Sequence, residues 1–185
     1  MNNGKLTTQE HEFVGTYLAS NRAEILTALR NLTPGQWAFR PSEPAWTLAE
    51  IAEHLALAER GLFRAVQKVM ALPADPARRA EIQVTYDDIV RRTTDRTSVV
   101  EAPERVVPTG KFPDGMTALL DFAQQRETAL AFLDQSTDLA LHDHFGSHPT
   151  LGTLDASQLL VFMAAHSQRH LGQIAEIRAS TLFPG

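Results

Sequence analysis

The stretch WTLAEIAEHLALAERGLFRAVQKVM, residues 46–70, decides the fold class of this 185-residue chain. Thr47 followed three residues later by Glu50 is a capping-box pattern, which predicts that a helix begins at this point. Apolar side chains then recur at three- and four-residue steps as far as Leu72. They are Ile51, Leu55, Ala58, Leu62, Val66 and Val69. The stretch is therefore predicted to be a long amphipathic helix with one buried face, and His54 lies on that face.

Three further segments, at about residues 8–31, 116–135 and 156–177, show the same helical period. Thr7 with Glu10, and Asp155 with Gln158, place helix-capping patterns at the start of the first and last of them. Four long amphipathic helices with few strand signals predict an all-α fold, an up-and-down four-helix bundle. No repeat or composition break marks a second domain, so residues 1–185 are predicted to form a single domain.

Two stretches between these helices are irregular. Residues 36–45 contain two prolines and are predicted to be an ordered loop. Residues 73–115 form a long, proline-bearing connection between the second and third core helices, with a short helix at about Tyr86–Thr93. A connection of this length in a compact domain often covers a functional pocket, and we expect it to do so here.

The composition excludes several function classes. The chain has no cysteine, which excludes thiolate zinc sites, a disulfide framework and a cysteine nucleophile of its own. A formal net charge of −5 argues against a nucleic-acid-binding surface, and the doublets Arg78-Arg79 and Arg91-Arg92 are interpreted as solvated helix surface. The longest apolar run, residues 159–165, is too short to cross a membrane, and the N-terminus lacks a secretory pattern. We therefore expect a cytoplasmic protein with no membrane partner.

Histidines supply the strongest functional signal. His166 and His170 are four residues apart on the last predicted helix, so both imidazoles share one face and can converge on one cation. With His54 they would make a three-ligand site with an open position for water or substrate. Zn²⁺ or Ni²⁺ suits three imidazoles best, and Fe²⁺, Mn²⁺ or Co²⁺ is also compatible. Glu50, one turn before His54, and Gln173, three residues after His170, are candidates for orienting these ligands or contacting substrate.

Structural interpretations compete with this one. A single core-facing histidine is more often a hydrogen-bonded structural residue than a ligand, and Glu50 and Gln173 could be ordinary polar surface. His142, His144 and His148 form a second cluster beside Asp143, but they lie in a loop whose shape the sequence does not specify. The triad is favoured because burial of three unpaired imidazoles would cost several kcal/mol, which a metal would offset.

Taken in order along the chain, these residues resemble the DinB-like family of bacterial metal-binding four-helix bundles. The resemblance rests on residues 46–55 with Glu59, and on HPTLGTLD at 148–155 leading into HSQRHLGQI at 166–174. It covers nearly the whole chain. In that family the histidine of the second helix and the paired histidines of the last bind a divalent metal, and the matching positions are His54, His166 and His170. Members with assigned activities resemble transferases and isomerases that use a low-molecular-weight thiol such as bacillithiol or mycothiol.

Two function classes follow. In the first, the metal binds a cofactor thiol, stabilises its thiolate and presents it to an electrophile, with Arg126 or Arg169 engaging a carboxylate of the small-molecule substrate. In the second, the chain is a non-catalytic, stress-associated protein that binds metal or a small molecule. The resemblance and the apolar first helix also predict a homodimer. The sequence leaves open the physiological metal, the thiol and the electrophile.

Overall fold

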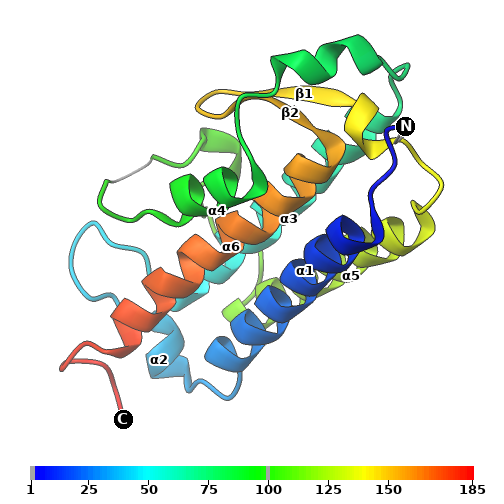
Figure 1. Cartoon of the computed structure of the whole chain (residues 1–185). Coiled ribbons are helices and arrows are strands. Elements are labelled where there is room, and N and C mark those ends of the chain that lie inside the picture. Colours follow the sequence, from blue (N-terminus) through cyan, green and yellow to red (C-terminus); the bar gives the residue numbers. More distant parts are fainter. Residues whose placement is uncertain (1–2, 99–100) are drawn as a thin grey trace.

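The computed structural model describes residues 3–98 and 101–185 (Figure 1). Four long helices make the bundle: α1 (Thr8–Leu29), α3 (Leu48–Met70), α5 (Gly115–Gln135) and α6 (Ala156–Arg178). The shorter elements are α2 (Pro34–Ala38), α4 (Tyr86–Thr94), the 3₁₀ helices η1 (Pro76–Glu81), η2 (Glu104–Val106) and η3 (Leu141–Asp143), and the strands β1 (Phe145–His148) and β2 (Gly152–Asp155). The predicted four-helix bundle is confirmed.

Helix starts follow the capping signals of the sequence. Thr47 accepts a hydrogen bond from the backbone of Glu50, and the Glu50 carboxylate accepts one from the backbone of Thr47. The same reciprocal pair forms at the starts of α1 and α6. The capping patterns therefore mark the helix starts correctly, and each satisfies backbone N–H groups that the first turn leaves unpaired.

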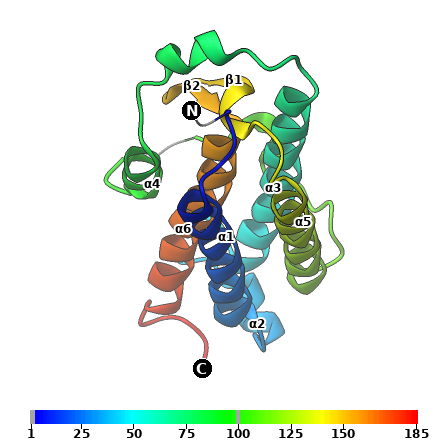
Figure 2. The same cartoon turned by 45° about the vertical axis from the view of Figure 1, so that its right-hand side comes forward.

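Two apolar clusters fill the bundle and show the direction of each helix. α1 and α3 each pack against α5 and α6. One cluster joins the start of α1 and α6 to the end of α3 and α5, through Val14, Leu18, Phe63, Val66, Ala129, Leu133, Leu159 and Leu160. The other joins the opposite ends, through Ile25, Leu29, Leu48, Ile51, Ala118, Leu119, Ile174 and Ile177. Helices α3 and α5 therefore run parallel to each other and antiparallel to α1 and α6 (Figure 2).

This direction corrects the prediction of an up-and-down bundle. The consecutive core helices α3 and α5 are parallel neighbours, so the chain must return along the bundle between them. A helix of 23 residues such as α3 is about 35 Å long. Residues 71–114 make that return, and their length is what a parallel pair requires.

Helix α2 and the hairpin of β1 and β2 lie where the sequence predicts only loops. Helix α2 begins within residues 33–36, where Thr33 and Gln36 form a capping box with Pro34 in the first turn. Strands β1 and β2 pair antiparallel as a hairpin that leads directly into α6, and Gly152 has a positive φ of 80° at the turn. Phe145 and Leu154 of this hairpin are buried, so it closes one end of the core. No helix in the described residues is long and apolar enough to cross a membrane.

Candidate metal centre

Three imidazole rings meet between the antiparallel helices α3 and α6. His54 lies in the second turn of α3, and His166 and His170 lie one turn apart on α6. Nε2 of His54 is 3.3 Å from Nε2 of His166. One ligand nitrogen from each of the three rings lies within 4.8 Å of the other two. His54 is 2% exposed, and the other two are partly buried. We refer to these residues as the histidine triad.

Two of the triad rings are oriented by hydrogen bonds from Nδ1 to residues outside the triad. Nδ1 of His54 donates to the carbonyl oxygen of Val106 at 2.8 Å, and Nδ1 of His170 donates to Oε1 of Gln173 at 3.0 Å. A neutral imidazole that donates through Nδ1 keeps a lone pair on Nε2. This is how metal-binding histidines are normally oriented by their outer contacts. Gln173 thus lies where it fixes the His170 ring.

Burial keeps the triad uncharged. It is the largest cause lowering the pKa of all three imidazoles, and the neighbouring rings lower the pKa of His166 and His170 further. The pKa of His170 falls to about 3, and that of His166 falls well below its ordinary value. The hydrogen bond to Val106 opposes part of this decrease in the pKa of His54. The neutral form that these shifts favour is the form that binds metal.

The triad geometry fits a single cation. Two nitrogens bound to a tetrahedral zinc ion at about 2.1 Å are separated by about 3.4 Å, and the His54–His166 separation is 3.3 Å. Within the described residues, the triad is the one group of three or more potential ligand side chains whose atoms converge. Three protein ligands leave coordination positions for water or substrate, which is the pattern of catalytic metal sites.

The long connection between α3 and α5 holds one side of the centre. The carboxylate of Glu53, next to His54, accepts hydrogen bonds from the backbone N–H groups of Thr109, Gly110 and Lys111 at 2.8–3.1 Å. A hollow of about 380 Å³ lies between this segment and α3, lined by Ala49, Glu50, Glu53, Pro108, Thr109, Gly110, Phe112, Pro113, Asp114 and Gly115. The connection is therefore fixed to the helix that carries His54.

Trp46 forms another wall of the centre. Its ring centroid is 4.9 Å from that of His54 and 6.5 Å from that of His170. Neither this contact nor the roles of Glu53 and Val106 was predicted from the sequence. The contacts of Trp46 with His170, of Glu53 with Thr109 and of His54 with Val106 each join residues more than fifty positions apart. The local signals were the adjacency of Glu53 to His54 and the position of Trp46 eight residues before His54.

The remaining candidate residues lie around the centre in different ways. Glu50 caps α3 and forms an ion pair with Arg40 at 2.8 Å. Arg169 is next to His170 and donates to the carbonyl oxygens of Asp95 and Ser98, so it ties residues 95–98 to α6. Neither side chain has a recorded contact with a triad nitrogen.

Arg126 lies inside the bundle. Its side chain is fully buried, and its guanidinium forms an ion pair with the carboxylate of Glu59. An arginine whose donors are all directed to internal acceptors is not available to a substrate carboxylate. Of the two roles expected for Arg126, a contact with substrate or an outer contact of the metal site, the burial of its side chain argues against the first, and the sequence did not reveal its internal partner.

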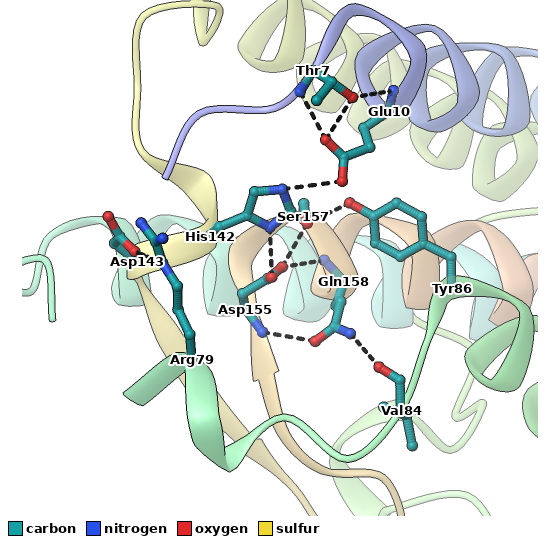
Figure 3. Close-up of polar contacts among 10 residues, drawn as sticks. All are labelled: Thr7, Glu10, Arg79, Val84, Tyr86, His142, Asp143, Asp155, Ser157 and Gln158. Atoms are coloured by element: carbon teal, nitrogen blue, oxygen red, sulfur yellow. Dashed lines mark hydrogen bonds and ion pairs between the residues drawn. The ribbon is translucent and has the colours of Figure 1, made fainter. Parts of the chain in front are cut away.

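The loop histidines do not form a second metal site. Nδ1 of His142 is 2.8 Å from Oδ2 of Asp155, and its Nε2 is 3.4 Å from Oε1 of Glu10 (Figure 3). Nδ1 of His144 contacts the carbonyl oxygen of Val69, and Nδ1 of His148 accepts from the backbone of Leu151. The three rings have separate partners, and no group of converging ligands within the described residues includes them.

The fold and the centre together define a class: a helical bundle with an open three-histidine site between two of its helices. The model of the DinB superfamily matches residues 17–174, and the chain belongs to that superfamily. The chain is 25% identical over 159 residues to the uncharacterized protein YuaE of Bacillus subtilis. The match covers 85% of this chain and 92% of YuaE.

A solved structure supports the same fold. YfiT from Bacillus subtilis, described as "a probable metal-dependent hydrolase with an unusual four-helix bundle topology", superposes with a TM-score of 0.65. The match covers 94% of this chain and 88% of YfiT at 15% sequence identity. At that identity the likeness establishes the shared fold.

Proposed function

We propose that the chain binds one divalent metal ion through His54, His166 and His170 and uses it to activate a small nucleophile. The observation that carries the proposal is the convergence of three neutral imidazole nitrogens without a fourth protein ligand among the described residues. Zn²⁺ or Ni²⁺ is the proposed metal, and Fe²⁺, Mn²⁺ and Co²⁺ are compatible with the same donors.

The proposed nucleophile is a low-molecular-weight thiol, and the proposed reaction class is thiol transfer or isomerisation. A bound divalent cation would stabilise negative charge on sulfur and favour the thiolate. The chain has no cysteine, so the thiol would come from a separate molecule. The DinB resemblance supports this class, because members with assigned activities resemble thiol-dependent enzymes.

Arg169 is the proposed contact for an anionic group of the substrate. It lies on α6 between His166 and His170, and its charge is among the causes that lower the pKa of both histidines. Among the described residues its side chain donates to backbone carbonyls and forms no direct ion pair, and the charges of Asp95 and Glu176 act on it from a greater distance. A carboxylate close to the triad would be attracted by this charge.

Two alternatives have their own support. Hydrolysis, with water as the nucleophile, is favoured by the description of YfiT as a probable metal-dependent hydrolase. A non-catalytic protein that binds metal or a small molecule would need the same triad and no bound thiol. The experiments below separate these alternatives from thiol transfer.

We also propose a homodimer in the cytoplasm. Phe13 on α1 is 39% exposed, and a surface hollow of about 380 Å³ lies along this helix, lined by Gln9, Glu12, Phe13, Thr16, Tyr17 and Ser20. Phe13 stacks against Tyr17 and Tyr86, and a contiguous aromatic surface of this kind suits contact with a second copy. Sedimentation that shows a monomer at micromolar concentration would contradict the dimer.

Metal binding can be followed through Trp46. Because its ring contacts two triad histidines, Co²⁺ bound at the triad should quench its fluorescence. The chain has two tryptophans, and Trp37 packs in α2 against Gly115. Trp37→Phe should retain the quenching at one equivalent of Co²⁺, whereas Trp46→Phe should lose most of it. Equal quenching in both variants would place the metal elsewhere.

The thiol is tested in the same cobalt-loaded protein. Bacillithiol, mycothiol and glutathione are added in turn, and sulfur coordination should produce a strong charge-transfer absorption band. A band that appears with one thiol and disappears in His54→Ala supports thiol transfer. If no thiol changes the spectrum, thiol transfer gives way to hydrolysis when ester or amide turnover is measured, and to the binding protein when it is not.

A further inference from the structure

A layer of buried polar side chains crosses the bundle beside the triad. It takes one residue from each core helix: Asn21 of α1, Glu59 of α3, Arg126 of α5 and Ser167 of α6. None of the four is more than 1% exposed. The layer lies between the two apolar clusters along every helix, so it separates them. We refer to these four residues as the polar layer.

Arg126 connects the polar layer. Its Nε and Nη2 both donate to the carboxylate of Glu59, the second at 2.9 Å. Nη2 also lies 2.8 Å from Oγ of Ser167 and 3.3 Å from the carbonyl oxygen of Met163. Nη1 donates to the carbonyl oxygen of Leu18 at 3.1 Å. The planar guanidinium has donors in fixed directions, so these contacts fix the relative positions of α1, α3 and α6.

Two of those helices carry the triad. Glu59 is five residues after His54 on α3, and Ser167 directly follows His166 on α6. Met163, whose carbonyl oxygen also accepts a hydrogen bond from Arg126, is three residues before His166. Arg126 therefore holds together the backbones of the two helices that carry His54 and His166, whose Nε2 atoms are 3.3 Å apart.

Stability alone does not account for this arrangement. Moving two charges out of water is costly, and replacing a buried ion pair with apolar residues of similar volume is often neutral or stabilising. Apolar clusters lie on both sides of the polar layer, so apolar side chains would suit these positions equally well. What an apolar pair would lack is the directional contact between α3 and α6.

We propose that Arg126 and Glu59 are positioning residues for the metal centre, holding α6 against α3 so that the nitrogens of His54 and His166 stay at ligand distance. A functional metal site keeps its ligand distances within about 0.2 Å, whereas sliding a helix by one residue moves its side chains by about 1.5 Å. Apolar packing tolerates small sliding motions that a metal site does not. This inference rests on the proposed metal-binding function.

The test compares zinc affinity with folding in the double variant E59L/R126M. Calorimetric titration with Zn²⁺ gives the affinity, and circular dichroism of the metal-free protein gives helix content and the melting temperature. We expect the variant to remain folded and to bind zinc about 10- to 100-fold more weakly, the range seen when outer contacts of metal ligands are removed. A purely structural ion pair predicts unchanged affinity in the folded variant.

Two controls separate positioning from general loosening. R60Q/D121N removes a second ion pair between α3 and α5, whose Nη2–Oδ1 distance is 2.7 Å but which lies nearer the surface. Leu133→Ala destabilises the apolar cluster without touching the polar layer. Both controls should keep wild-type zinc affinity. A comparable loss of affinity in either control would overturn the inference.

Ser167→Ala covers the case in which the double variant does not fold. This substitution removes only the hydroxyl of α6 that accepts a hydrogen bond from Arg126. We expect zinc affinity to fall about tenfold, the lower end of the 10- to 100-fold range. Wild-type affinity in Ser167→Ala, or in a folded E59L/R126M, would overturn the inference. Failure of the wild-type protein itself to bind zinc would overturn the proposed function first, so the two failures are distinguishable.

Discussion

The histidine triad and His142 place the same side chain in opposite surroundings. The triad rings face one another inside the bundle with no carboxylate among their converging ligand atoms, whereas His142 lies between Asp155 and Glu10 at the end of the bundle where α6 begins. Burial lowers the pKa of the triad histidines, and the hydrogen bond to Asp155 raises the pKa of His142. The neutral triad is suited to bind a cation, whereas His142 is suited to carry a positive charge itself.

The comparison shows why histidine spacing alone does not identify a metal site. His142 joins the starts of α1 and α6, because Glu10 lies in the capping box of one helix and Asp155 is the N-cap of the other (Figure 3). Asp155 also accepts a hydrogen bond from Ser157, which in turn accepts one from Tyr86 of α4. His142 thus belongs to a structural network, and the nearby carboxylates decide that role.

The largest expected effect tests whether the histidine triad is the metal site. His166→Ala should abolish stoichiometric metal binding, because two imidazoles hold a labile ion far less tightly than three. The loss should exceed the 10- to 100-fold range of outer contacts, at about 100-fold or more. Elemental analysis after dialysis measures the metal content. His144→Ala is the matched control, and equal metal loss in both variants would show that the triad is not the site.

The second-largest effect tests the structural role of His142. His142→Ala leaves the buried Oδ2 of Asp155 without its recorded partner, which should cost about 1–3 kcal/mol in the free energy of unfolding. Urea denaturation of the metal-free protein measures it. Zinc affinity should stay at the wild-type value, and a variant that lost metal but not stability would reverse the roles assigned to the two groups.

Local sequence signals predicted much of this division. Thr47 with Glu50 and Asp155 with Gln158 placed two helix starts, because a capping box is formed by residues three apart. The spacing of His166 and His170 put both rings on one face of α6. The parallel course of α3 and α5 had one sequence signal, the length of the connection at residues 73–115, which was interpreted as the cover of a pocket and not as a crossover along the bundle. The burial of Arg126 was missed because its partner Glu59 is 67 residues away.

The third effect sharpens the comparison within the triad. Gln173→Ala removes the acceptor that orients His170, so zinc affinity should fall about 10-fold or somewhat more, without loss of stoichiometric binding. Competition with a chelator of known affinity measures the change. Gln124→Ala, an exposed glutamine on α5, is the control and should match the wild type. No change in Gln173→Ala would mean that packing alone orients the ring.

The smallest expected effect concerns the pH dependence of stability in the metal-free protein. The pKa of His142 is raised in the folded state, first by the hydrogen bond to Asp155 and further by Glu10. Its stabilising contribution is therefore fully present below its unfolded pKa of about 6.5 and is lost as the pH rises through the folded value. The triad acts in the opposite direction. Its lowered pKa values mean that stability is lost as the pH falls below about 6.5, because the unfolded chain then binds protons that the folded triad excludes.

Urea denaturation across this pH range separates the two contributions. The difference in unfolding free energy between wild type and His142→Ala should be largest below about pH 6.5 and should shrink as the pH rises. His166→Ala should instead lessen the loss of stability on the acid side, because one buried imidazole that resists protonation has been removed. The pKa of Glu10 is lowered, so its carboxylate remains charged in the acid part of this range and continues to attract His142. If the His142→Ala difference were independent of pH, the ring would be a neutral hydrogen-bonding residue, and the contrast between the two groups of histidines would be one of geometry and not of charge.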